Sequence, residues 1–315
     1  MRRFGFLVQV VISVVCLAAV AIMVHPAEAW DAISRANPLA LAAVFALMPA
    51  AILARAWRWR YILARQAMTV PLSTMYRVVF IASALNLFLP ASMGDLASSY
   101  YGWRAHGNKE AMLASAMADK ITGLLTLCLL GIACASAIGE WNLAMVTLAF
   151  TVPLAVVILF PRLIPWQWAS FIFRKLFRKV LRADLLHQTT HLRLSTVGGA
   201  VAISVLGWVF TNLMYYFACL AFVPDVSIAY VFAVAPLINL MRVLPVTVSG
   251  LGSADMLIVF LFGLVGMANA DAFAASMAVN LALLIVPGLI GLGFILSNRG
   301  WHARAPEENA RNEIG

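Results

Sequence analysis

The chain has 315 residues, of which 63% are hydrophobic and 11% are charged, and its formal net charge is +9 at pH 7. A soluble domain of this length cannot hide so much apolar surface, so the composition excludes one and predicts an all-α polytopic membrane protein. The basic residues lie between apolar stretches, where membrane topology accounts for them and no nucleic-acid partner is needed.

The first predicted span is Phe4–Val24, followed by an external loop to residue 37. Arginines before it and Ala27-Glu28-Ala29 after it resemble a secretory signal with a cleavage site. The run of 21 residues is long enough to cross a bilayer, so we expect a retained helix. The second span, Pro38–Ala56, leads into tryptophans and arginines from Arg55 to Arg65, a pattern typical of an interfacial aromatic belt on the cytoplasmic side.

The next apolar unit, Tyr76–Trp103, is interrupted by Pro90 and Gly94. Proline lacks a backbone donor and glycine favours irregular backbone, so a helix should break here. Two complete spans need about 40 residues, and this unit has 28. Basic residues flank both ends, so we predict a hairpin that enters the bilayer from the cytoplasm and returns.

Two further spans follow, Ala111–Ile138 and one that ends near Phe160. Segment 161–195 alternates basic and apolar residues, which predicts an amphipathic helix whose partners are the anionic lipids of the inner leaflet, through 162–193. His187 and His191 are four residues apart, a spacing that can chelate a metal on a helix. No third ligand is near them in the sequence, so we expect a solvated pair, with no metal and no other cofactor.

The fifth span, Thr196–Leu220, precedes a second broken hairpin, Ile228–Gly266. Each of its apolar arms is too short to cross a hydrocarbon core of about 30 Å. The last span, Phe273–Leu296, leads to a charged tail, 297–315.

This topology has about six full spans and two re-entrant hairpins, with the N- and C-termini in the cytoplasm. It leaves all but three of the 22 Lys and Arg residues on the cytoplasmic side, the exceptions being Arg35, Lys120 and Arg242. That asymmetry satisfies the positive-inside rule. We therefore expect a single multi-pass domain, 1–315, in a bacterial-type cytoplasmic (inner) membrane.

The two hairpins share a motif but enter from opposite sides. This predicts an inverted repeat, 38–160 and 196–296, of the kind that many transporters use to expose a midplane site to each side in turn. Free N–H groups at each break would suit an anion. The candidate substrate-binding residues are Asn86, Pro90, Gly94 and Asp95 in the first hairpin, and Asn239, Arg242, Pro245, Gly250, Gly252 and Asp255 in the second.

Several of these carboxylates have a second interpretation. Asp95 and Asp255 either cap the half-helices that follow the breaks or bind a substrate or proton. Asp119 and Lys120 form either a mutual pair near the interface or a support in which Asp119 reaches the first hairpin. Arg242 places a cation at depth, where charges are usually functional.

The chain resembles the flippase-like membrane family that includes the transmembrane region of lysylphosphatidylglycerol synthase, from about Arg55 to Leu296. The resemblance implies movement of an anionic or lipid-linked substrate between leaflets. It rests on Arg58-Trp59-Arg60-x-x-Leu63, Asn86-x-x-x-Pro90-x-x-x-Gly94-Asp95, Asp119-Lys120, and Pro245 with Gly250-x-Gly252-x-x-Asp255.

The chain departs from the family pattern at four places. Met93 replaces the first glycine of a Gly-Gly-Asp, and Ser98 stands where an arginine is common. Lys120 replaces the arginine of an Asp-Arg pair, and Asp255 replaces a glutamate. The lost arginine is a plausible headgroup contact, so these changes bear on the substrate.

The leading hypothesis is a lipid flippase for an anionic phospholipid or a lipid-linked substrate of the polyprenyl-phosphate or glycolipid type, and no enzyme activity. One alternative is a membrane-embedded enzyme that modifies lipid headgroups, in which Asp95, Asp119 and Asp255 supply acid–base groups or hold a metal. Another is a partner subunit that docks a glycosyltransferase or lipid-synthesis enzyme through 162–193. Association into a homo-oligomer is left open.

Overall fold

In the computed structural model of the protein, the described residues are 11–16, 18–19, 22, 24, 26–66, 68–89, 93–159, 194–243, 247 and 250–297. Every regular element within these ranges is a helix, which confirms the predicted all-α class. The helices are α2 (Pro26–Arg35), α3 (Pro38–Ala64), α4 (Leu72–Asn86), α5 (Gly94–His106), α6 (Lys109–Ala137), α7 (Trp141–Leu159), α10 (Leu194–Leu220), α11 (Ile228–Val243), α12 (Ser253–Gly263), α13 (Asn269–Asn280), the π-helix η3 (Leu281–Ile285) and α14 (Val286–Ser297).

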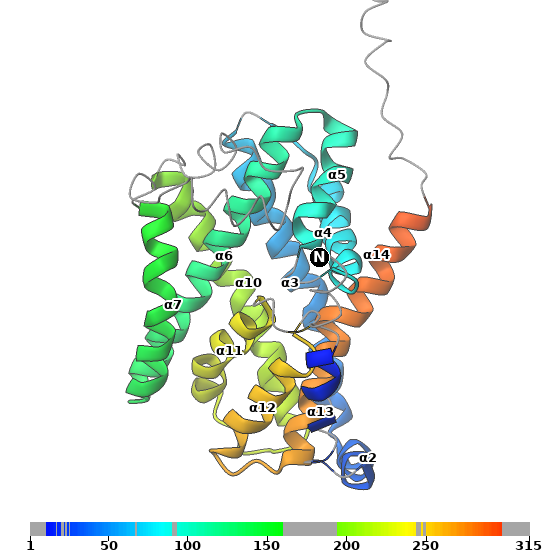
Figure 1. The fold of residues 1–315 in the computed structure, drawn as a ribbon, viewed down its shortest axis with the longest axis vertical. Coiled ribbons are helices and arrows are strands. Elements are labelled where there is room, and N and C mark those ends of the chain that lie inside the picture. Colours follow the sequence, from blue (N-terminus) through cyan, green and yellow to red (C-terminus); the bar gives the residue numbers. More distant parts are fainter. Residues whose placement is uncertain are drawn as a thin grey trace, which may run out of the picture.

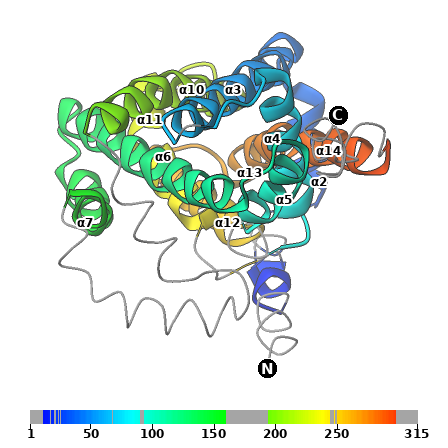
Figure 2. The ribbon, with the colours of Figure 1, turned by 90° about the horizontal axis from the view of Figure 1, so that it is seen from above.

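Four stretches are long and apolar enough to cross a membrane: α3, α6, α10 and the continuous run α13–η3–α14. They correspond to the second, third, fifth and last predicted spans. The fourth predicted span is α7, which lies beside α6 at the margin of the bundle (Figure 2). Most of Phe4–Val24, segment 161–193 with His187 and His191, and the tail from residue 298 lie outside the described residues.

Helix α3 has a well-defined start and runs further than predicted. Pro38 occupies its first turn, and the Asn37 side chain accepts hydrogen bonds from the N–H groups of Leu39 (3.0 Å) and Ala40 (3.3 Å). The prediction that this span ends at Ala56 is wrong, because the helix continues for eight residues to Ala64.

The interfacial-belt interpretation of this extension is also wrong for two of its residues. Arg58 is 7% exposed and Trp59 is 1% exposed. The indole Nε1 of Trp59 donates to Ser115 Oγ at 2.9 Å. Both side chains have polar partners inside the bundle, which offsets the cost of burying their polar groups.

Both predicted hairpins consist of two helices around an interruption. Helix α4 ends at Asn86 and α5 begins at Gly94, while α11 ends at Val243 and α12 begins at Ser253. In each hairpin the two helices pack against each other. Figure 1 shows α4 and α5 in the upper half of the molecule and α11 and α12 in the lower half. Pro90 and Pro245 lie outside the described residues.

Glycine is required where the hairpin backbones approach most closely. A Cβ at Gly94 would lie 2.5 Å from the carbonyl oxygen of Ala82 and from the backbone nitrogen of Asn86, so the start of α5 fits against the end of α4 only without a side chain. Gly250 and Gly252 have φ values of +78° and +84°, in the region that favours glycine.

The last span is interrupted by the π-helix η3. Pro287 follows it in the first turn of α14 and has no N–H to donate to the preceding turn, so a regular ladder could not continue unchanged. Short π segments often occur at functional sites.

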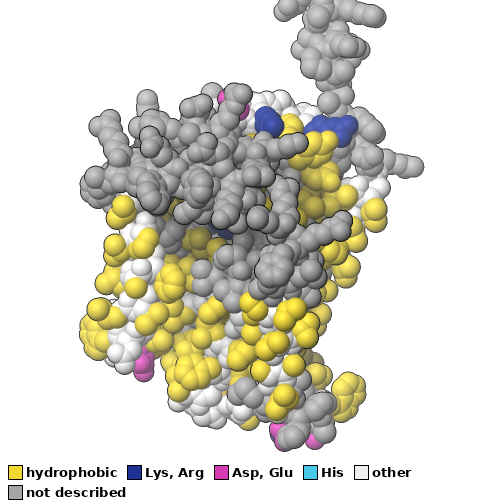
Figure 3. All heavy atoms as spheres, in the orientation of Figure 1, with side chains coloured by type: hydrophobic (Ala, Val, Ile, Leu, Met, Phe, Trp, Pro, Cys, Tyr) yellow, Lys and Arg dark blue, Asp and Glu magenta, His cyan; other side chains and the backbone are white. Residues whose placement is uncertain are grey.

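Apolar and basic side chains occupy different parts of the surface, as they occupy different stretches of the sequence. Figure 3 shows hydrophobic side chains along the sides of the described part and basic side chains at its upper end, where α3 and α14 also end (Figures 1 and 3).

Candidate functional site

Residues beside both hairpin interruptions line one cavity of about 250 Å³. Asn86 and Asp95 come from the first hairpin, and Asn239, Arg242 and Val243 come from the second. The long helices α3, α6 and α10 and the π-helix complete the walls. The other polar lining residues are Arg55, Arg58, Ser83, Asp119, Lys120, Ser204, Trp208 and Thr211.

The spacing of these residues along their helices explains why they face one space. Residues three or four apart share a helix face. The lining residues show this spacing on five helices: Arg55 and Arg58 on α3, Ser83 and Asn86 on α4, Asp119 and Gly123 on α6, Ser204 and Trp208 on α10, and Asn239 and Arg242 on α11.

The least exposed ion pair of the cavity is formed by Arg58 and Asp119. Arg58 donates from Nε to Asp119 Oδ1 at 2.6 Å and from Nη2 to Oδ2 at 2.8 Å, a bidentate geometry. Arg58 Nη1 also donates to Ser204 Oγ at 3.1 Å. The pair therefore connects α3, α6 and α10.

A second group surrounds Asp95 in the first turn of α5. Arg55 Nη2 lies 2.6 Å from Asp95 Oδ1, and Lys120 Nζ lies 3.2 Å from Oδ2. The amide of Asn86 donates to Oδ1 at 3.0 Å, and its oxygen accepts from the N–H of Gly94 at 2.7 Å. The Asp95 carboxylate is thus paired with two cations. Asn86 connects the two ends of the interruption.

A third group holds the second hairpin. Arg242 donates from Nη2 to Asn280 Oδ1 at 2.7 Å and from Nε to the Tyr215 hydroxyl at 3.3 Å. Asp255, which is fully buried, accepts from Asn280 Nδ2 at 2.8 Å, from the Ser276 hydroxyl and from the N–H of Gly252 at 2.8 Å. This network joins both ends of the interruption to α13.

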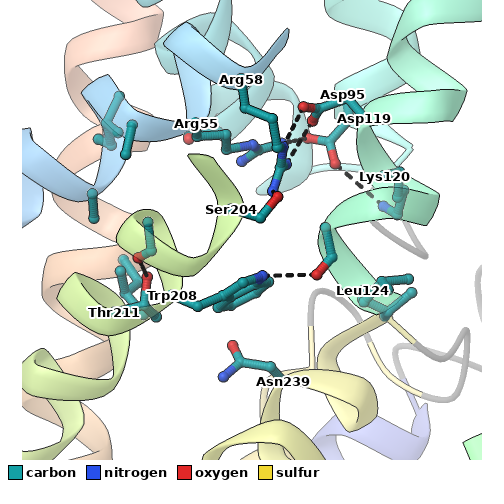
Figure 4. A pocket seen from close by; sticks show the side chains of 18 of the residues that line it. Arg55, Arg58, Asp95, Asp119, Lys120, Leu124, Ser204, Trp208, Thr211 and Asn239 are labelled. Atoms are coloured by element: carbon teal, nitrogen blue, oxygen red, sulfur yellow. Dashed lines mark hydrogen bonds and ion pairs between the residues drawn. The ribbon is translucent and has the colours of Figure 1, made fainter. Parts of the chain in front are cut away.

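Trp208 is an aromatic side chain in the wall of the cavity. Its indole Nε1 donates to the backbone carbonyl of Gly123 at 2.7 Å, which fixes the ring between α10 and α6. Figure 4 shows the ring between the charged groups around Arg58 and Asp119 and the amide of Asn239.

Seven of the thirteen predicted site residues line the cavity: Asn86, Asp95, Asn239, Arg242, Arg58, Asp119 and Lys120. Gly94 adjoins it through Asn86. Gly250, Gly252 and Asp255 are not among the lining residues, and Asp255 takes the capping position that was one of its two interpretations.

The prediction that Asp119 and Lys120 form a mutual pair is wrong, because Asp119 pairs with Arg58 and Lys120 pairs with Asp95. The alternative, that Asp119 reaches the first hairpin, is also wrong, because both oxygens of Asp119 are held by Arg58 on α3. Lys120 makes that contact, because consecutive residues on a helix point in different directions.

Sequence reasoning missed Arg55, Ser204, Trp208 and Asn280 as site residues. The first three had a signal, since each lies three or four residues from another polar residue on one face of an apolar helix. Asn280 had no such signal, because its partners Arg242 and Asp255 lie on other helices that only tertiary packing brings next to it. Within the described ranges, no three His, Cys, Asp or Glu side chains gather in a way that could hold a metal ion.

Comparison with known proteins agrees with the resemblance seen in the motifs. The family model described as the lysylphosphatidylglycerol synthase TM region matches residues 6–291. A UPF0104 membrane protein of Methanothermobacter thermautotrophicus is 23% identical over 322 residues, which cover 91% of this chain and 94% of the relative.

Proposed function

The chain is a multi-pass membrane protein that belongs to the family of the lysylphosphatidylglycerol synthase transmembrane region, and from this premise we propose that it is a lipid flippase. Its substrate would be a lipid with an anionic headgroup, either a phospholipid or a lipid-linked molecule of the polyprenyl-phosphate or glycolipid type. The membrane would be the cytoplasmic membrane of the cell.

The observation that carries the proposal is the charge of the cavity. Its described lining includes four cationic side chains, Arg55, Arg58, Lys120 and Arg242, but only two carboxylates, Asp95 and Asp119. Ionised groups are costly among apolar helices unless they are paired or serve a ligand. An excess of positive charge in such a place favours an anionic ligand.

The arrangement of the hairpins supports alternating access. Residues beside their interruptions line the same cavity, and the two hairpins lie in opposite halves of the molecule (Figure 1). In an inverted repeat, rocking of one half against the other opens a shared site to each side in turn. The headgroup would occupy the cavity while the acyl or prenyl chains stay in the bilayer.

The contacts of the carboxylates favour transport over headgroup chemistry. Both oxygens of Asp119 are held by Arg58. Asp255 accepts hydrogen bonds at one oxygen from Gly252 in the second hairpin and at the other from Asn280 on α13. A general acid or base needs a position within hydrogen-bond reach of the reacting proton. Carboxylates that are saturated by protein donors suit a structural role better.

A leaflet-exchange assay tests the proposal. The purified chain is placed in vesicles that carry fluorescent phosphatidylglycerol, a fluorescent polyprenyl phosphate or fluorescent phosphatidylcholine, and a membrane-impermeant reductant then bleaches the outer leaflet. We expect protein-dependent exchange of an anionic lipid that is faster than that of phosphatidylcholine. The Arg55→Gln protein should lose this exchange, and Arg65→Gln, at the exposed end of α3, should retain it. Absence of exchange for every anionic lipid tested would overturn the proposal.

A further inference from the structure

The two ion-pair groups of the cavity differ in their accessibility. The side chains of Arg58 and Asp119 are 9% and 6% exposed, as in a closed structural pair. Around Asp95, the Arg55 side chain is 32% exposed and that of Lys120 is 23% exposed, whereas Asp95 itself is 12% exposed. The cations of this second group thus present surface to the cavity.

The position of Asp95 is the one that an anionic ligand would occupy. Its two oxygens lie between a guanidinium from α3 and an ammonium from α6, at 2.6 and 3.2 Å. Arginine binds phosphate oxygens in the same fork-like geometry as carboxylate oxygens, and lysine binds either as a point charge. A phosphate group in the cavity would therefore compete with Asp95 for the same two donors.

The carboxylate of Asp95 would also be stabilised if it lost its contacts with the two cations. It lies in the first turn of α5, where the N-cap residue Met93 forms no side-chain hydrogen bond to the helix. A carboxylate in the first turn of a helix is stabilised by the positive end of the dipole and by unsatisfied N–H groups. The amide of Asn86 can accompany it, since Asn86 already contacts both Asp95 and Gly94. Release from Arg55 and Lys120 would therefore not leave the charge without stabilisation.

We infer that Asp95 is an internal counter-ion that holds the headgroup site of the empty protein and is displaced from Arg55 and Lys120 by the phosphate group of the ligand. This deepens the proposed function, from which it takes the lipid substrate. Because Asp95 belongs to the first hairpin whereas both cations belong to long helices, exchange of the counter-ion would loosen the hairpin from α3 and α6 when the ligand binds.

A titration of the full chain in detergent tests the inference. The two probes are dihexanoyl phosphatidic acid and inorganic phosphate. Asp95→Asn keeps the side-chain shape but removes the competing charge, so it should bind dihexanoyl phosphatidic acid about ten- to a hundredfold more tightly than the unaltered chain, as expected for one charge-assisted contact. Asp271→Asn is the matched control, because Asp271 lies in the first turn of α13 and does not line the cavity. Its affinity should equal that of the unaltered chain.

A double substitution separates direct competition from a general effect of charge. If Asp95 competes for Arg55, the gain from Asp95→Asn should disappear when Arg55→Gln is also present. A gain that persists in the double variant, or an Asp95→Asn protein that binds no more tightly, overturns the inference. If Asp95→Asn does not fold, Asp95→Ser replaces it, because serine is favourable near a helix start.

The two probes identify the source of the phosphate group. Tighter binding of phosphatidic acid than of inorganic phosphate supports a lipid headgroup, whereas equal binding supports free phosphate and overturns the lipid part of the inference. Failure of the flippase proposal gives a different result from failure of the counter-ion inference. In that case leaflet exchange is absent, although Asp95→Asn still binds phosphatidic acid more tightly than the unaltered chain. If leaflet exchange is normal but Asp95→Asn binds phosphatidic acid no more tightly than the unaltered chain, only the counter-ion inference is refuted.

Discussion

Arg58 and Asp119 are 61 positions apart and form a two-point ion pair with distances of 2.6 and 2.8 Å. The pair joins α3 to α6, and Ser204 adds α10 through the third guanidinium nitrogen. Burial of two charges carries a large desolvation cost, so such a pair contributes little net stability but makes the loss of one partner expensive. It therefore links three long helices beside the cavity, and each of its two charges depends on the other.

Asp119→Asn should lower the free energy of unfolding by about 3–5 kcal/mol, because it leaves the Arg58 charge buried without its partner. Thermal unfolding in detergent measures the change. The double variant Arg58→Met with Asp119→Leu should recover most of the loss, since an apolar pair removes both charges. A double variant as unstable as Asp119→Asn would show that the pair itself stabilises the fold.

Gly94→Ala should destabilise the first hairpin by about 1–3 kcal/mol, because backbone atoms of α4 that cannot move aside lie 2.5 Å from the new Cβ. Gly198→Ala is the matched control: a Cβ at Gly198, on α10, meets nothing within 4 Å. The control should be neutral or stabilising by up to about 1 kcal/mol. Limited proteolysis within 87–93, compared between the two variants, reports on the hairpin directly. Equal cleavage would contradict the close approach of α4 and α5.

Asp255→Asn should destabilise the second hairpin by about 1–3 kcal/mol, because an amide nitrogen would replace an oxygen that accepts a buried hydrogen bond. The affected donors are the N–H of Gly252, the Ser276 hydroxyl and the Asn280 amide. Asp225→Asn, at an exposed position before α11, should change stability by less than about 0.5 kcal/mol. Chemical denaturation of both variants in the same detergent checks the contrast. Similar denaturation midpoints would mean that the Asp255 network does not hold the hairpin.

Arg242→Gln should reduce the amount of anionic lipid that co-purifies with the protein, because it removes a cation from the cavity wall. Loss of one charge-assisted contact weakens affinity by about tenfold or more. Native mass spectrometry of the purified protein measures the bound lipid. Arg104→Gln, which alters an exposed arginine in contact with Tyr100, should leave the lipid content unchanged. Unaltered lipid occupancy in Arg242→Gln would exclude this residue from headgroup binding.

Much of the fold could be predicted from local properties of the sequence. Spans such as α6 and α10 were recognisable because hydropathy is a property of consecutive residues, and the interruptions around Gly94 and Gly250 because glycine and proline act on their own backbone. The end of α3 was not predictable in this way. Arginine and tryptophan look interfacial in a linear sequence, and only the partners of Arg58 and Trp59 inside the bundle explain why the helix continues.

The sequence by itself determined that this is a helical membrane protein with two broken hairpins and a few charges placed among apolar helices. Only the tertiary structure decided how those charges combine: Asp119 with Arg58, Lys120 with Asp95, and Arg242 with Asn280. The physical reason is that hydropathy and backbone preference act over a few residues, whereas the partner of a buried charge depends on which helix faces meet, here between residues up to 146 positions apart.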